Sequence, residues 1–193
     1  MILYQLCRPI AYLAIKHPEK KIADWYVPLF LASLGSIGAL LAHGHINFFG
    51  AGGLVSSVLG FVQNLPGFYI AALAAIATFG RNDIDSVMPG NPPPRLETLT
   101  NSGVSNLISL TRRRFLCLLF AFLTVECVAL TMLSIVAIAV APTLSTWATK
   151  WPVVHLVAFL GVFFVYAILL SQLLVATLWG LYYLGDRIHQ PDS

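Results

Sequence analysis

The chain has 193 residues, of which 58% are hydrophobic and 10% are charged, and its formal net charge is +3. A soluble domain averages about 45–50% apolar and about 25% charged residues. A chain with so few charges cannot cover the surface of a soluble globule, and one so apolar does not stay disordered. The composition therefore predicts an integral membrane protein.

Three long blocks of the sequence are almost free of charge. Residues 25–80 contain no Asp, Glu, Lys or Arg, residues 115–149 contain only Glu126, and residues 151–185 contain none. A transmembrane helix needs about 20 apolar residues, so the first block holds two spans and each of the others holds one. The predicted fold is all-α, with four transmembrane helices at about 25–42, 54–79, 115–141 and 153–184.

The second span contains Pro66, which interrupts a regular helix. Two alternatives remain open from the sequence. The segment is either one kinked helix or an interfacial helix followed by a short span that begins near Leu65.

The distribution of Lys and Arg predicts the orientation, because these residues concentrate on the cytoplasmic side of a membrane. With four spans, ten of the 11 Lys and Arg residues fall on one side, and Lys150 alone falls on the other. We therefore expect a multi-pass protein of the inner membrane whose two termini, including the tail 185–193, are cytoplasmic. The ten are Arg8, Lys16, Lys20, Lys21, Arg81, Arg95, Arg112, Arg113, Arg114 and Arg187.

Residues 1–24 form a cytoplasmic segment with an amphipathic pattern, in which apolar residues such as Leu6 and Ile10 alternate with basic ones. This pattern is typical of a helix that lies on the inner leaflet. Lys16, Lys20 and Lys21 are the candidate contacts of this segment with lipid or with a soluble partner.

The cytoplasmic loop 81–114 is longer than a simple connection, which usually takes about 4–6 residues. Pro92, Pro93 and Pro94 predict an extended stretch. After them, a helix capped by Asn101 or Ser102 is expected to continue through Leu107 into the third span. At the end of the loop, Arg112, Arg113 and Arg114 are expected to fix the topology beside lipid headgroups, or to contact lipid or a protein. Direct nucleic-acid binding is not expected, because no aromatic residues interleave with these arginines.

The remaining metal-ligating residue types give weak signals. His43, His45 and His155 fall near the outer boundary, but no carboxylate or cysteine supports them as a metal site. The three cysteines, Cys7, Cys117 and Cys127, have no metal-binding or disulfide spacing. We therefore predict no metal, no cofactor and no catalytic residue.

Glu126 is the one charged residue well inside a predicted span, about 16 Å from Phe115 at the helical rise. Depth matching offers Ser36, Tyr69 and Gln172 as its partners. Three interpretations stay open: a neutral hydrogen-bonded structural residue, a ring of glutamates in an oligomer, and a proton or cation relay.

Small residues such as Ala32 and Ser36 in span one, with Ala71 and Ala75 in span two, favour close packing of these two spans.

The total length, the four-span plan and the cytoplasmic face formed by Met1–Asp24, Arg81–Arg114 and Gly185–Ser193 resemble the membrane component of the Kiwa anti-phage defence system of bacteria. The resemblance implies an oligomeric sensor that anchors a soluble effector, and it assigns no role to a particular residue.

Two hypotheses of different classes follow. The first is a non-enzymatic, homo-oligomeric membrane protein that anchors or signals to a soluble cytoplasmic partner. This hypothesis is based on the expectation that almost all residues outside the membrane are cytoplasmic. The alternative is a small ion channel or proton-coupled transporter that uses Glu126.

Overall fold

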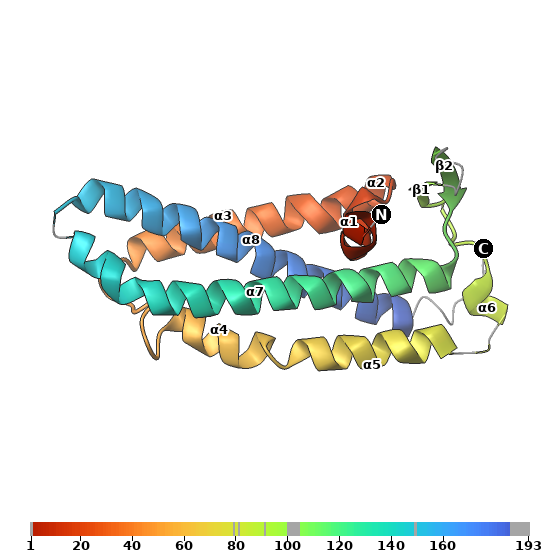
Figure 1. The fold of residues 1–193 in the computed structure, drawn as a ribbon. Helices are drawn as coiled ribbons and strands as arrows, with labels where there is room; N and C mark the ends of the chain where they lie inside the picture. Colours follow the sequence, from red (N-terminus) through yellow and green to blue (C-terminus); the bar gives the residue numbers. More distant parts are fainter. Residues whose placement is uncertain are drawn as a thin grey trace.

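The computed structural model describes residues 2–78, 80, 82–90, 92–99, 105–148 and 150–185, and in it the chain is an elongated helical bundle (Figure 1). Within these residues, four helical segments are long and apolar enough to cross a membrane, which confirms the predicted number by length and composition. They are Ile22–Leu41, Leu54–Thr78, Arg112–Thr146 and Pro152–Gly185.

The helix α7 is the centre of the bundle. It contacts the segments on either side of it, namely α5, α4 and α8, and also the N-terminal 3-10 helix η1. Its core face is lined by large apolar residues, among which Phe115, Leu119 and Leu123 are buried. The bundle helices are α3 (Val27–Leu41, preceded by the π-helical turn η2, Ile22–Tyr26), α4 (Leu54–Val62), α5 (Leu65–Thr78), α7 (Arg112–Ala148) and α8 (Pro152–Gly185).

The second span is broken into α4 and α5, which are separated by Gln63 and Asn64. Pro66 is the second residue of α5, where its missing N–H costs no helical hydrogen bond. A separate helix thus begins at Leu65, within the one apolar segment Leu54–Thr78 that is long enough to cross a membrane.

The expected close packing of spans one and two is wrong. The helix α3 packs against α8, while α5 packs against α7 on the other side of the bundle. Ala32 and Ala39 of α3 are buried, whereas an added Cβ at Gly35 or Gly38 would meet no atom within 4 Å. The small residues of span one thus divide between a face that contacts α8 and a face that contacts no part of the described chain.

In place of one amphipathic helix, the N-terminal segment contains three short ones: α1 (Ile2–Leu6), η1 (Arg8–Ala14) and α2 (Pro18–Lys21). Pro9 and Pro18 each lie at the start of a new helix, because proline lacks the N–H that a continuing helix needs. Tyr12 is completely buried, and its ring stacks on Phe122 of α7 with 5.1 Å between the centroids. The segment therefore packs against the bundle through η1.

The loop before α7 contains a β-hairpin where a helix was expected. After the short helix α6 (Asn82–Asp85), strand β1 (Arg95–Leu99) pairs antiparallel with β2 (Ser105–Ser109). Leu107 therefore lies in β2 and not in a helix, and the proposed caps Asn101 and Ser102 lie outside the described residues. Ser and Asn compete for backbone hydrogen bonds and are weak helix formers, whereas buried Leu96 and Leu110 anchor the two arms of the hairpin.

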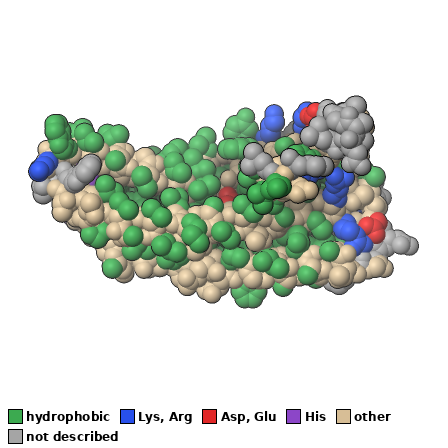
Figure 2. Space-filling view, viewed as in Figure 1, with side chains coloured by type: hydrophobic (Ala, Val, Ile, Leu, Met, Phe, Trp, Pro, Cys, Tyr) green, Lys and Arg blue, Asp and Glu red, His purple; other side chains and the backbone are tan. Residues whose placement is uncertain are grey.

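The two ends of the bundle differ in composition. The sheet end carries Ile2–Lys21, α6 and the hairpin, and the turn end carries the connections 42–53 and 150–151 (Figure 1). In Figure 2 the Lys and Arg side chains gather at the sheet end, while the length of the bundle shows mostly apolar and uncharged surface. Among the described Lys and Arg residues, Lys150 alone belongs to the turn end.

Candidate functional site

Five polar side chains from five elements meet inside the bundle, and we refer to them as the buried polar cluster. They come from η1, α2, η2, α7 and α8, so the cluster joins the N-terminal segment to three of the spans. Its charged members are only 2–4% exposed. The members are Tyr12, Lys20, Asp24, Glu126 and Gln172.

Lys20 and Asp24 form the ionic centre of the cluster. The Lys20 ammonium donates a hydrogen bond to Oδ2 of Asp24, four residues further along the chain. The Tyr12 hydroxyl donates to Oδ1 of the same carboxylate at 3.1 Å. The Lys20 ammonium also lies 3.7 Å from the centroid of the Tyr12 ring, which is a cation–π contact. Each charge is thus compensated, as a buried ion pair requires.

Gln172 connects this ionic centre to the last span. Its Nε2 donates to the main-chain oxygen of Asp24 at 3.0 Å. Since Asp24 lies in η2, directly before α3, this bond fixes the start of the first span against α8.

Glu126 contributes a carboxyl group without a hydrogen-bond partner among the described residues. Both of its oxygens are buried, and its side chain is 4% exposed. It lies within electrostatic range of Asp24 and of Tyr12. Lys20 and Asp24 compensate one another, so Glu126 is the charged-type member of the cluster whose carboxyl group lacks a hydrogen-bond partner among the described residues.

Glu126 and Ser36, which depth matching offered as partners, form no hydrogen bond with one another. Glu126 lies instead within electrostatic range of Asp24, at the beginning of the first span. Ser36 lies 12 residues beyond Asp24, which is about 18 Å along a helix. Its buried hydroxyl has no hydrogen-bond partner among the described residues.

The other two predicted partners of Glu126 bond elsewhere. Gln172 bonds to the main chain of Asp24, as described above. The Tyr69 hydroxyl is 2.6 Å from the hydroxyl of Thr177, although Tyr69 remains within electrostatic range of Glu126.

Burial changes the acidity of the cluster members that lie outside the spans. It lowers the pKa of the Lys20 ammonium, while the neighbouring Asp24 carboxylate acts in the opposite direction. It raises the pKa of the Tyr12 hydroxyl, and the negative charge of Asp24 adds to that increase. Tyr12 is therefore a hydrogen-bond donor at neutral pH and not a phenolate.

The candidate lysines of the N-terminal segment have different environments. Lys20 belongs to the buried polar cluster, so it is not on the surface where a lipid or partner contact was expected. Lys21 is exposed, and Lys16 is an exposed residue whose ammonium is 3.9 Å from Glu97 in β1. The main chain of Lys16 also pairs with Arg95, which covers part of the free edge of β1.

The three arginines at the start of α7 are not equivalent. Arg112 is buried, and Arg114 is partly buried. Arg113 binds the Asp85 carboxylate through Nε and Nη2, at 2.7 and 2.9 Å, and its Nη1 donates to the Ile76 carbonyl at 2.7 Å. Arg113 therefore caps the C-terminal end of α5, in agreement with the preference for cations at that end of a helix.

The proline stretch leads from the bundle into the hairpin. Pro92 is exposed, Pro93 is partly buried and Pro94 is buried. The Pro94 carbonyl accepts a hydrogen bond from the Leu110 N–H at 3.0 Å, so the end of this stretch is part of the hairpin and the beginning is on the surface.

Sequence reasoning missed Asp24 and Tyr12. A signal for Asp24 was present, because Lys20 and Asp24 are spaced four apart, as in an ion pair on a helix, and Asp24 directly precedes an apolar run. Tyr12 carries no such signal. Its role depends on η1 folding back on α7, which the local sequence does not specify.

The histidines and cysteines form no metal centre in the described part of the chain. The rings of His43 and His155 are 6.2 Å apart, and His43 packs edge-on against Phe159. The three thiols are free.

The chain matches no protein-family model, no curated protein and no solved structure.

Proposed function

We propose that this chain is a non-enzymatic, multi-pass inner-membrane protein whose sheet end lies in the cytoplasm and binds a soluble protein partner. The observation that carries the proposal is the construction of the sheet end. Three separate parts of the chain, namely the N-terminal segment, α6 and the hairpin, assemble there, while the turn end has only short connections.

The hairpin offers the most suitable contact surface. In β2, Leu107 is an apolar side chain that is 47% exposed, with exposed Asn106 and Ser109 near it. The main chain of Lys16 covers part of one edge of the hairpin, at Arg95. A strand edge that stays uncovered is a common docking site for another chain. Exposed Lys16 and Glu97 add charges of both signs.

Homo-oligomerisation is part of the same proposal. Phe30, Leu34, Ile37 and Leu41 are exposed along one face of α3. Their spacing of four, three and four residues is that of a helix–helix contact. Since α3 packs mainly on α8 within one chain, this face is available to a second copy. By its resemblance to the Kiwa membrane component, such an assembly fits a membrane sensor in anti-phage defence.

Site-specific photo-crosslinking in cells tests the partner. A photoreactive phenylalanine derivative replaces Leu107 in one variant and Ile46 in a control, because Ile46 is similarly exposed but lies at the turn end. We expect a soluble protein to be crosslinked from position 107 and not from position 46. Crosslinks from position 107 to lipid alone would contradict the proposal.

The alternative function, a small channel or proton-coupled transporter, is favoured by one observation. Glu126 is buried without a hydrogen-bond partner in the described structure, within electrostatic range of Asp24. Proton or cation flux into liposomes that contain the purified protein tests this function. Flux that Glu126→Gln abolishes would favour transport, and absence of flux in the unmodified protein would exclude it.

A further inference from the structure

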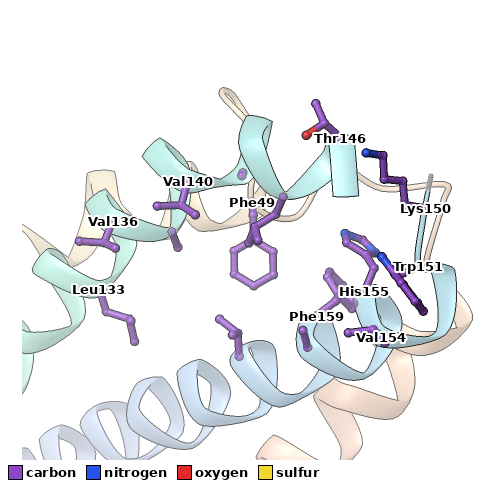
Figure 3. A pocket seen from close by; sticks show the side chains of 15 residues that line it. Phe49, Leu133, Val136, Val140, Thr146, Lys150, Trp151, Val154, His155 and Phe159 are labelled. Carbon is purple, nitrogen blue, oxygen red and sulfur yellow. The ribbon is translucent and has the colours of Figure 1, made fainter. Parts of the chain in front are cut away.

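A groove with a volume of about 1060 Å³ separates the turn-end halves of α7 and α8. Figure 3 shows the ring of Phe49 directed into the space between the two helices. The walls of the groove are apolar, and they include Leu133, Val136 and Val140 of α7 and Val154, Ala158 and Val162 of α8.

The helix α7 contains a proline in this region. Pro142 lies in the part of α7 that lines the groove, and it removes one N–H from the helical hydrogen-bond pattern. Figure 1 shows that α7 changes direction near the turn end, as expected beside a proline. From Leu133 to Thr146 the groove extends about 20 Å along α7, which exceeds the hydrocarbon depth of one leaflet, about 15 Å.

The polar residues of the groove are confined to its end at the turn between the helices. Thr146, Lys150 and His155 lie there beside Trp151 (Figure 3). Lys150 is exposed. The sequence contains no Asp or Glu in residues 25–82 or in residues 127–185, which are the parts of the chain that build the turn end. No carboxylate of these segments neutralises Lys150.

This arrangement matches the order of groups in a phospholipid. The apolar walls suit an acyl chain, and the cation at the end of the groove suits an anionic headgroup. Trp151, which is 67% exposed, belongs to the residue type that concentrates at headgroup depth. A second copy of the chain is a poorer occupant, because its own turn-end segments have no acidic residue to pair with Lys150.

We propose that the groove between α7 and α8 is a binding site for a phospholipid with an anionic headgroup, whose acyl chain lies against Val140 and Ala158 and whose headgroup pairs with Lys150. This site is independent of the partner surface at the sheet end.

Native mass spectrometry of the purified protein, exchanged into equal amounts of phosphatidylglycerol and phosphatidylcholine, tests the proposal. We expect the unmodified protein to retain phosphatidylglycerol with a preference of about fivefold, the effect of one basic side chain beside an anionic headgroup. Lys150→Gln should abolish the preference but still retain lipid. Ala158→Phe, which fills the groove, should reduce retention of both lipids.

Two matched variants serve as controls. Arg95→Gln removes an exposed cation of the sheet end, and Ala71→Phe adds a ring to an exposed position of α5. Both should retain phosphatidylglycerol as the unmodified protein does. Equal retention of the two lipids by the unmodified protein, or loss of the preference in Arg95→Gln as well as in Lys150→Gln, would overturn the proposal. Because Lys150 is exposed, Lys150→Gln is expected to fold. The test of the headgroup preference therefore stands even if Ala158→Phe does not fold. A disulfide between two copies of a Val140→Cys variant would show that a second chain occupies the groove instead.

Discussion

Gln172 donates a hydrogen bond to the main-chain oxygen of Asp24 at 3.0 Å, and this bond joins α8 to the beginning of the first span. The two residues are 148 positions apart in the chain. Asp24 in turn binds Lys20 and Tyr12, so the N-terminal segment, the first span and the last span meet at one point. Through Tyr12 and Lys20, the N-terminal segment therefore contributes to the interior of the bundle.

The first prediction concerns the Lys20–Asp24 pair. Removing one partner, as in Asp24→Asn or Lys20→Met, leaves the other buried without compensation and should lower the free energy of unfolding by about 3–5 kcal/mol. The double variant Lys20→Met with Asp24→Asn should recover a substantial part of that loss. Unfolding in mixed detergent micelles measures both effects. Equal stability of all four proteins would show that the pair is not buried.

The second prediction concerns Glu126. A hydrogen-bonded structural residue was one of three interpretations from the sequence, and the structure shows no hydrogen-bond partner for Glu126 in the described residues. Glu126→Leu should therefore fold with unchanged or increased stability, because it removes an uncompensated buried polar group. Glu126→Gln, which keeps a polar group there, is the comparison. Thermal unfolding monitored by circular dichroism distinguishes them, and a strongly destabilised Glu126→Leu would mean that the carboxyl has a partner.

The third prediction concerns Arg113 and its pH dependence. The Arg113 guanidinium lowers the pKa of the Asp85 carboxyl below its ordinary value, which is about 3.9. The contribution of this pair is therefore fully present above that ordinary pKa and is lost as the pH falls through the lower pKa of the folded protein. Hydrogen exchange at the C-terminal turn of α5 should stay slow down to about pH 4. Arg113→Ala should accelerate exchange there at neutral pH, whereas Arg114→Ala should not.

The fourth prediction concerns the orientation in the membrane. A membrane-impermeant maleimide, applied to intact cells, should label Ala51→Cys at the turn end in a Cys7→Ser background. In the unmodified protein, exposed Cys7 at the sheet end should react only after the membrane is permeabilised. The opposite pattern would place the sheet end outside and would contradict a cytoplasmic partner.

The sequence alone determined the four apolar segments that are long enough to cross a membrane, because length and hydrophobicity act locally along the chain. It also indicated the interruption near Leu65, since proline restricts the backbone wherever it occurs. These properties need no knowledge of which helix neighbours which.

Only the tertiary structure determined which helices pack against one another, and therefore which residues form the candidate site. Small residues in α3 were compatible with several helices, and packing selected α8 instead of the second span. The sequence pattern was equally compatible with a Lys20 side chain that faces lipid. The fold of η1 and α2 directs it toward Asp24 instead. Counting residues from Phe115 offered Ser36 as a partner of Glu126 because it assumes that every span begins at the same depth. In the bundle, the residue of the first span that lies within electrostatic range of Glu126 is Asp24 at its start.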